Sequence, residues 1–328
     1  MEAAGRSAFV TGGSGFIGGR LIERLVGDGV RVRALARSDE SAEGVRRRGA
    51  EPVRGDLDHV DAMREGASGC EWAFHAAARV EDSGSREEFE RVNVTGTENV
   101  LRAAAGAGVS RFVHVGTEAA LLAGDPLVNV DESAPLRPDS KSLYPSTKAK
   151  AEQAVRGASS DGFETVVVRP RFVWGPGDTT VLPQIAAAVR SGRFAWIGGG
   201  RHLTSTTHVD NVVHGLILGA ERGAAGKAYF VTDGEPVVFR EFVSALLDTQ
   251  GIEAPNRTMP SALAAALAAA SETLWATLPL PGSPPITRMA YWASAQECTI
   301  DISRARSELG YEPVKSLEDG LAELRAAA

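Results

Sequence analysis

Short apolar runs alternate with amphipathic stretches along the first half of the chain. The runs predict six strands, at Ser7–Thr11, Val30–Ala36, Glu51–Arg54, Trp72–His75, Phe112–Val115 and Thr165–Val168. Apolar residues at helical spacing predict five helices between them, at Phe16–Val26, Ser41–Arg48, Val60–Glu65, Arg86–Ala107 and Leu143–Arg156. Strands that are apolar throughout are typical of a sheet covered on both faces. The alternation therefore predicts an α/β fold with a doubly wound parallel sheet and right-handed crossovers.

The regular alternation stops after Val168, where Arg169-Pro170 and Gly175-Pro176-Gly177 interrupt the pattern. Further helices are predicted at Leu182–Arg190, Val209–Glu221, Phe239–Gln250, Ser261–Leu278, Ser303–Leu309 and Leu317–Ala326. We expect one domain over residues 1–168 and a smaller C-terminal lobe over residues 169–328. The apolar run Ala228–Val231 predicts a strand that returns from this lobe to the first sheet.

A glycine-rich turn joins the first predicted strand to the first predicted helix. Gly12, Gly15 and Gly18 fit the pattern G-x-x-G-x-x-G, and Gly13 with the last two also fits G-x-G-x-x-G. Glycine permits close backbone approach to a pyrophosphate, and the helix N-terminus that follows offers free N–H groups. The context of strand, turn and helix supports a Rossmann dinucleotide-binding domain over residues 1–168. The residues predicted at the phosphates are Gly12, Gly15, Phe16, Ile17 and Gly18.

The second predicted strand is followed by a basic residue and not by an acidic one. An Asp or Glu there would bind the ribose hydroxyls of NAD(H), whereas this sequence has Arg37 and Ser38, with Arg33 nearby. Because Arg can accommodate a 2′-phosphate, the pattern favours NADP(H). An Arg37 that stacks on adenine or faces solvent is the alternative, so NAD(H) stays open.

Three side chains have the chemistry of a proton-transfer site. Tyr144 and Lys148 are four residues apart at the start of a predicted helix, which places them on one face. A phenol with a pKa of about 10 is a poor base at neutral pH, but a nearby ammonium and an oxidised nicotinamide would lower that pKa. Thr117 follows the strand Phe112–Val115, at the carboxyl edge of the sheet where ligands bind. Its hydroxyl can hold a substrate oxygen beside Tyr144.

Together these motifs resemble the extended short-chain dehydrogenase/reductase superfamily over nearly the whole chain. The resembling residues are the glycine turn, Gly55-Asp56-Leu57, His75-Ala76-Ala77-Ala78, Asn93, Thr117, Tyr144–Lys148 and Arg169-Pro170. The resemblance implies that Tyr144 is the general acid/base, that Lys148 tunes it and holds the nicotinamide ribose, and that Thr117 orients the substrate oxygen. The remaining cofactor contacts that it implies are Asp56 and Leu57 at the adenine, Ala76, Ala77 and Ala78 along the dinucleotide, and Arg169 and Phe172 near the nicotinamide.

The second half resembles the branch of 3β-hydroxysteroid dehydrogenases and sterol-4-carboxylate 3-dehydrogenases. The resembling segments are Thr207–Gly215, Gly226–Pro236 and Pro284–Arg288. A bacterial reductase of long-chain 3-keto acids resembles the same branch. The resemblance implies an NAD(P)-dependent enzyme that moves hydride between NADP(H) or NAD(H) and a secondary alcohol or ketone of a lipophilic substrate, of the 3β-hydroxysteroid, sterol or β-keto acid type.

Two other functions stay open. One is a nucleotide-sugar 4-epimerase of the same superfamily, and the other is a protein that senses dinucleotides without turnover. Dehydration of a nucleotide sugar is disfavoured, because dehydratases carry two acidic residues after the hydroxyl and here Glu118 is followed by Ala119. No metal is predicted. Hydride transfer needs none, and we expect His208 and Asp210 to have a structural role at the start of a helix.

The segment Ser261–Leu278 is unusually rich in alanine, with four leucines close to one helical face: Leu263, Leu267, Leu274 and Leu278. One interpretation is a helix packed over the substrate pocket. The other is a lipophilic lid or a helix on a membrane surface, which would give a peripheral membrane contact. Glu272 and the Ser and Thr residues argue against full insertion.

Composition narrows the classes of molecule that the chain can bind and the compartment in which we expect it. The 328 residues carry a net charge of −7 without a long basic run, which argues against nucleic acid. There are only two cysteines, Cys70 and Cys298, and no signal-peptide pattern, so we expect a cytoplasmic enzyme without disulfides. Whether it forms a homodimer is left open.

Overall fold

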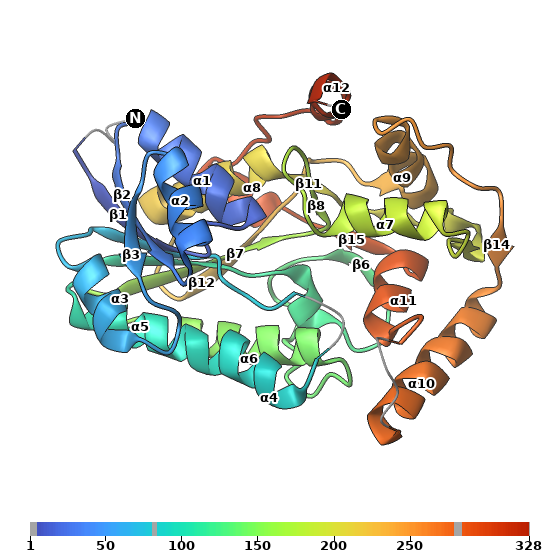
Figure 1. Ribbon diagram of the computed structural model, residues 1–328, viewed down its shortest axis with the longest axis horizontal. Helices are drawn as coiled ribbons and strands as arrows, with labels where there is room; N and C mark the ends of the chain where they lie inside the picture. Colours follow the sequence, from blue (N-terminus) through green and yellow to red (C-terminus); the bar gives the residue numbers. More distant parts are fainter. Residues whose placement is uncertain (1–4, 81–83, 279–283, 328) are drawn as a thin grey trace.

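A seven-stranded parallel sheet forms the larger part of the computed structural model, which describes residues 5–80, 84–278 and 284–327 (Figure 1). The strand order is β12-β7-β5-β4-β1-β2-β3, which is a doubly wound Rossmann order. The strands are β1 (Ser7–Thr11), β2 (Arg31–Ala36), β3 (Glu51–Arg54), β4 (Trp72–His75), β5 (Arg111–Val115), β7 (Glu164–Pro170) and β12 (Lys227–Val231). Each agrees with its expected limits to within two residues, and the expected fold class is confirmed.

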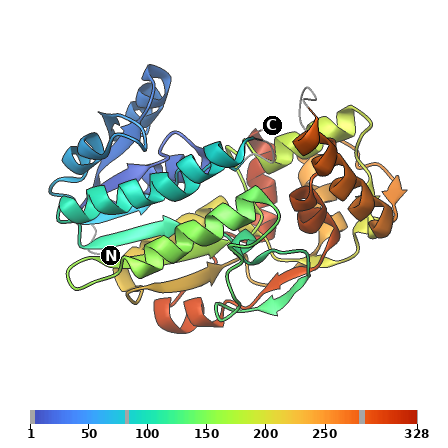
Figure 2. The same cartoon turned by 90° about the horizontal axis from the view of Figure 1, so that it is seen from below.

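Helices cover both faces of this sheet. One face carries α1 (Phe16–Gly27), α2 (Asp39–Arg47) and α8 (Val209–Arg222). The other carries α3 (Val60–Ala67), α5 (Gly96–Gly106) and α6 (Leu143–Gly157), of which α5 and α6 lie side by side (Figure 2). Side chains alternate between the two cores along each strand. In β1, for example, Phe9 packs with the α3 and α5 side, whereas Ala8 and Val10 pack with the α1 and α8 side.

The helix expected over Arg86–Ala107 is interrupted. It consists of α4 (Arg86–Phe89), a π-helical segment over Glu90–Thr95, and α5. Asn93 lies within the π-helical segment, where its side chain accepts from the Arg79 N–H and donates to Thr147 of α6. Wide turns of this kind occur where a helical side chain is needed in an unusual position.

A smaller lobe is built from short strands and helices. Its four-stranded sheet has the order β13-β10-β15-β6, from β6 (Leu127–Val130), β10 (Leu203–Thr204), β13 (Val237–Val238) and β15 (Cys298–Ile300). Two further pairs join β8 (Val173–Trp174) to β11 (Thr207–His208) and β9 (Trp196–Ile197) to β14 (Thr258–Met259). The lobe helices are α7 (Val181–Arg190), α9 (Phe239–Asp248), α10 (Ser261–Thr277) and α11 (Arg288–Ala295). An aromatic core holds the lobe together, with Trp174, Trp196, Phe239 and Phe242 buried in it.

Asp233, just beyond β12, joins the sheet to the lobe. Its carboxylate accepts hydrogen bonds from Trp174 Nε1 at 2.7 Å, Thr206 Oγ1 at 2.8 Å, His208 N at 2.6 Å and Asn211 Nδ2 at 2.7 Å. These donors come from β8, from the strand region before α8, and from α8 itself. The last helix, α12 (Leu317–Ala327), closes over the same region, where Gly320 lies directly against the Trp174 ring.

Helix α10 lies at the outer edge of the lobe (Figure 1). Its buried face consists of Ala264 and Ala268, and Glu272 pairs with Arg288 of α11. The four leucines are exposed by 43–50%. The leucine face is therefore not the face that packs on the lobe, because small alanine side chains form that contact. Across the described ranges, none of the helices combines the length and apolar character needed to cross a membrane.

Candidate active site

The glycine turn after β1 has no room for side chains. Gly12 has a φ of +76°, and a Cβ there would lie 2.6 Å from the Ala77 nitrogen. A Cβ on Gly18 would lie 2.2 Å from the Gly12 carbonyl oxygen. The turn therefore folds against Ala76 and Ala77, which follow β4, and Ala76 N donates to Thr11 O at 3.1 Å. The bare backbone that results is the surface on which a pyrophosphate can lie.

The N-terminus of α1 is open. Gly15 is its N-cap residue, so no side chain caps the first turn and the N–H groups of Phe16 and Ile17 have no cap partner. In contrast, Ser38 caps α2 by accepting from Ser41 N. An uncapped helix start beside a glycine turn fits an anionic phosphate group.

The end of β2 presents a cation. Arg37 is exposed and forms no hydrogen bond or ion pair with any other residue that the structure describes. The Ser38 hydroxyl, in contrast, is engaged in the cap of α2. Of the two residues expected at the adenosine ribose, Arg37 is thus the one whose side chain remains available.

The segment after β3 has ordered side chains of its own. Asp56 accepts from Asp58 N at 2.9 Å and lies 2.6 Å from His59 Nδ1, and these hydrogen bonds lower the pKa of its carboxyl despite partial burial. Leu57 packs against Gly96, and its carbonyl accepts from Asn99. The Asp56 carboxylate is thus turned towards the start of α3.

Tyr144 and Lys148 lie in the first turns of α6. Tyr144 is half-buried, and Lys148 is buried. The Lys148 ammonium donates to Val115 O at 2.8 Å and to His114 Nε2 at 3.1 Å, both on β5. Burial lowers the pKa of Lys148 from 10.5 to about 8, against an opposing effect of Glu152. The lysine is therefore held by the strand that leads to Thr117.

Two buried histidines, to which the sequence analysis assigned no role of their own, lie beneath this region. His75 of β4 and His114 of β5 are paired in register, and their ring centroids are 5.2 Å apart. His75 is held by Thr11 at 2.6 Å and Thr97 at 2.9 Å. Burial lowers the pKa of His75 to about 3, and burial with the neighbouring Lys148 lowers that of His114 well below its usual range. Both rings are therefore neutral, and the histidines near the ends of successive predicted strands were the signal for them.

Thr117 follows β5 and begins a short 3-10 helix over Glu118–Leu121. Its hydroxyl donates to Glu118 Oε2 at 2.8 Å and accepts from Ala119 N at 3.1 Å. Glu118 is paired with Arg171, whose Nη1 donates to Oε1 at 2.8 Å, and both side chains are buried. Sequence reasoning missed this pair, since the two residues are far apart along the chain.

The carboxyl end of β7 does not offer the Arg169 side chain to a ligand. Its guanidinium forms a buried bidentate pair with Glu152 of α6 and lies over the Phe230 ring. Phe172 has a φ of +42°, a left-handed conformation that is uncommon outside glycine, and its ring packs against Phe239 and Phe242. Only the backbone here and the exposed part of Phe172 remain for a nicotinamide.

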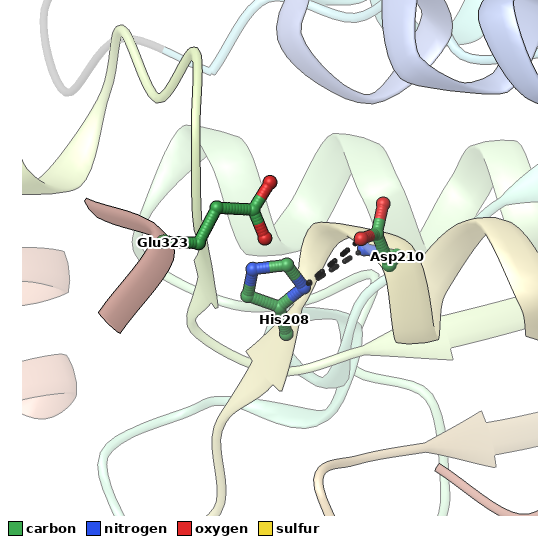
Figure 3. A group of neighbouring side chains, drawn as sticks. All are labelled: His208, Asp210 and Glu323. Carbon is green, nitrogen blue, oxygen red and sulfur yellow. Dashed lines mark hydrogen bonds and ion pairs between the residues drawn. The ribbon is translucent and has the colours of Figure 1, made fainter. Parts of the chain in front are cut away.

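A cluster of His208, Asp210 and Glu323 has atoms close enough to hold a metal ion (Figure 3). Two cations already neutralise its carboxylates, since Arg20 Nε is 2.5 Å from Asp210 and Lys315 Nζ is 2.9 Å from Glu323. His208 Nδ1 accepts from Asp210 N and thereby caps α8. The cluster is an ionic crosslink between α1, α8 and α12, with the structural role expected for His208 and Asp210.

A Rossmann sheet with an open glycine turn, and a Tyr–Lys helix beside a threonine at the carboxyl edge, define an extended short-chain dehydrogenase/reductase. The model of the 3-beta hydroxysteroid dehydrogenase/isomerase family matches residues 9–261. The chain belongs to this family and is an oxidoreductase, so the resemblance seen in the sequence is confirmed.

Three proteins show how far the similarity extends. The chain is 49% identical over 319 residues to the 4-hydroxy-2-methyl-3-oxo-4-farnesyl-3,4-dihydroquinoline-1-oxide ketoreductase of Stigmatella aurantiaca, covering 97% of this chain and 96% of that one. It is 36% identical to the 2-alkyl-3-oxoalkanoate reductase of Stenotrophomonas maltophilia, covering 97% and 98%. The crystal structure of a dTDP-glucose 4,6-dehydratase from Streptomyces venezuelae has a TM-score of 0.76 at 24% identity, covering 98% and 96%. This last likeness concerns the fold alone.

Proposed function

We propose that the chain is an NADP(H)-dependent ketoreductase or secondary-alcohol dehydrogenase for a substrate with a large apolar substituent. The observation that carries the proposal is the buried Lys148, held by β5 one helical turn from Tyr144 and next to the strand end that carries Thr117. This arrangement supports an acid/base, a charge that tunes it and a hydroxyl for the substrate oxygen at the carboxyl edge of a dinucleotide-binding sheet.

The residues around the glycine turn fit a dinucleotide. The backbone at Gly12–Gly18 and the uncapped start of α1 would hold the pyrophosphate, and Ala76, Ala77 and Ala78 would lie along the cofactor. Arg37 would bind the 2′-phosphate of NADP(H), because its guanidinium is exposed and has no partner among the residues described. The nicotinamide supplies or accepts the hydride when it is bound.

The side chains of this site would transfer a proton to and from the substrate oxygen. In the reductive direction the Tyr144 phenol gives its proton to the substrate oxygen, and in the oxidative direction the phenolate takes it back. The Lys148 ammonium favours the phenolate by its charge. The Thr117 hydroxyl would contact the substrate oxygen beside Tyr144. No metal is needed for this exchange.

The names of two relatives support a lipophilic ketone. One acts on a farnesylated ring that bears a 3-oxo group and the other on 2-alkyl-3-oxoalkanoates. Both substrates place the ketone beside a long apolar chain. We propose the same class here, a ketone flanked by an alkyl or prenyl substituent, and the smaller lobe as its binding region.

Reduction of a 2-alkyl-3-oxoalkanoate by the purified protein, followed as NADPH oxidation, tests the proposal. We expect Tyr144→Phe to lower kcat by at least about 100-fold, since the general acid is lost, with NADPH binding retained. Unchanged turnover in this variant would exclude the mechanism. Tightly held NAD⁺ together with thermal stabilisation by UDP-sugars would instead identify a 4-epimerase. Cofactor binding without reduction of any ketone in a broad panel would identify a dinucleotide sensor.

We also propose that the leucine face of α10 gives the enzyme a peripheral membrane contact. Leu263, Leu267 and Leu274 are exposed along one face, and the paired Glu272 is the charged residue of the helix. The protein should float with liposomes, and Leu267→Glu with Leu274→Glu should abolish flotation. Val314→Glu, at an exposed apolar position outside α10, is the matched control and should float like the parent. Equal flotation of all three proteins would remove the proposed contact.

A further inference from the structure

The hydroxyl of Thr117 already has two partners before any substrate binds. A threonine hydroxyl has one proton to donate and two lone pairs that accept. The proton goes to Glu118 Oε2 at 2.8 Å, and one lone pair accepts from the Ala119 N–H at 3.1 Å. The remaining capacity of this oxygen is a second lone pair.

Glu118 is itself held in place. Glu118 and Arg171 are each only 3% exposed, and Nη1 of Arg171 donates to Oε1 at 2.8 Å. Arg171 Nη2 also donates to Thr204 Oγ1 and to Ala293 O, each at 3.2 Å. The guanidinium is thus tied to β10 and to α11. Turning Glu118 away would leave a buried cation without its partner, which is strongly unfavourable.

We propose that Glu118, held by Arg171, is a positioning residue. It accepts the hydrogen bond that the Thr117 hydroxyl donates, so that Thr117 meets the substrate oxygen as a hydrogen-bond acceptor. This inference rests on the proposed oxidoreductase function, in which Thr117 binds the substrate oxygen beside Tyr144. It assigns Glu118 and Arg171 a part in substrate discrimination and not in proton transfer.

Whether Thr117 donates or accepts a hydrogen bond decides which form of the substrate it binds. A secondary alcohol carries an O–H that can donate to the free lone pair of Thr117. A ketone oxygen only accepts. It can accept a hydrogen bond from the Tyr144 phenol, but not from Thr117, because the Thr117 hydroxyl donates to Glu118. The site therefore favours the alcohol over the ketone, compared with a site in which the hydroxyl is free to donate.

Thr117→Val tests this directly, because it removes the hydroxyl and keeps the branched shape. The probes are a 2-alkyl-3-oxoalkanoate with NADP⁺ and the matching 2-alkyl-3-hydroxyalkanoate with NADPH, two combinations that cannot react, titrated by calorimetry. We expect the alcohol to bind about five- to tenfold more weakly and the ketone nearly as before, since one hydrogen bond is lost. A larger loss for the ketone would show that Thr117 donates, and the proposal would be overturned.

Glu118→Gln gives the opposite change. Arg171 will keep donating to the amide oxygen, so the amide NH₂ faces Thr117 and turns its proton towards the substrate. The ratio of ketone to alcohol affinity should rise about five- to tenfold, and this rise should vanish when Thr117→Val is also present. A rise that persists without the hydroxyl, or no rise at all, contradicts the proposal.

Glu132→Gln is the matched control. Glu132 is also a buried carboxylate with an arginine partner, Arg304, but it bonds to Phe230 N of β12 and not to Thr117. It should leave the ratio of affinities unchanged. If it shifts the ratio as much as Glu118→Gln does, loss of a buried charge explains the effect and the proposal fails.

A urea-unfolding cycle over Thr117→Val, Glu118→Gln and the double variant gives a readout without substrate. The proposal requires the two changes to be non-additive, because Thr117→Val removes the same hydrogen bond that Glu118→Gln reverses. Additive changes in the free energy of unfolding would overturn the proposal, even if Glu118→Gln is itself destabilised. If neither probe binds to any variant, the proposed substrate class fails, while the unfolding cycle still decides the link between Glu118 and Thr117.

Discussion

Lys148 carries its charge in a part of the site closed to solvent. Its ammonium has a backbone carbonyl and the neutral His114 ring as partners, and neither supplies a negative charge. Burial therefore brings its pKa to about 8. A small rise in pH is therefore enough to deprotonate Lys148 and remove its charge.

We expect kcat to fall as pH rises through about 8, by about tenfold per pH unit, because the neutral amine no longer stabilises the Tyr144 phenolate. Stability should change in the opposite sense. The unfolded chain regains the Lys148 proton below 10.5, so between about 8 and 10.5 it binds more protons than the folded chain and stability rises with pH. Rate profiles and urea unfolding over pH 7–10 measure both, with Lys148→Met as the reference. An alkaline limit of kcat near 10.5 would contradict the effect of burial.

The partner of Lys148 on β5 can be tested by substitution. His114→Leu removes the Nε2 acceptor, so the alkaline limit of kcat should move to lower pH, because an ammonium without this partner is harder to keep charged. His114→Gln places an amide oxygen near the position of Nε2 and should restore the limit. The other charged or titratable groups that face Lys148 are His75 on β4, and Tyr144 and Glu152 on α6, and they are unchanged in both variants. If His114→Leu and His114→Gln have the same alkaline limit of kcat, the acceptor at this position has no effect and His114 only packs against Lys148.

Arg37 decides the cofactor in our proposal. Arg37→Asp should weaken NADPH binding by at least about tenfold and NADH binding much less, since an exposed guanidinium pairs with the 2′-phosphate that NADH lacks. Fluorescence titration with both cofactors measures this. Arg47→Asp, on the exposed side of α2, controls for the change in net charge. Equal losses for NADPH and NADH would remove the argument for a 2′-phosphate site.

At the scale of elements, the turn between β1 and α1 leaves no room for side chains at Gly12 and Gly18. Its glycines are required by contacts within the turn and with the segment after β4. The alternation of apolar runs predicted this element and its neighbours well, because each strand or helix of the main sheet is long enough to show a period. Most strands of the lobe have only two residues, too few for any period, so their existence depends on partners elsewhere in the chain.

Gly18→Ala should lower the free energy of unfolding by about 1–3 kcal/mol and abolish dinucleotide binding, because its Cβ would overlap the Gly12 carbonyl oxygen. Gly27→Ala, in the same helix with open space around its Cβ, should be neutral or stabilising by up to about 1 kcal/mol. Urea unfolding and NADPH titration provide the measurements. Normal cofactor binding by Gly18→Ala would show that the turn can relax.

At the scale of the whole molecule, a few polar residues join the sheet to the lobe. Asp233 accepts from four donors on β8, α8 and the segment before α8, and the crosslink of Arg20, Asp210, Lys315 and Glu323 ties α12 to the same place. Such contacts fix the lobe relative to the cofactor edge of the sheet. They act together with the apolar core that the sheet shares with β6 and β15.

Asp233→Ala should cost about 2–4 kcal/mol of unfolding free energy, because it leaves several buried donors without an acceptor. Asp248→Ala removes an exposed carboxylate that pairs with Arg325 and should change stability by less than about 1 kcal/mol. Chemical denaturation of the two variants makes the comparison. A small effect of Asp233→Ala would show that water or a shifted side chain replaces the carboxylate.

The sequence by itself determined the main sheet, the glycine turn and the positions of Thr117, Tyr144 and Lys148, because each depends on spacing within one or two neighbouring elements. Only the tertiary structure decided the rest. Glu118 and Arg171 meet across 53 residues, and His114 reaches Lys148 from another element. It also turned the leucine face of α10 outward, since the alanines allow the closer approach to the lobe. Contacts between distant segments leave no period in the sequence, so folding alone brings them together.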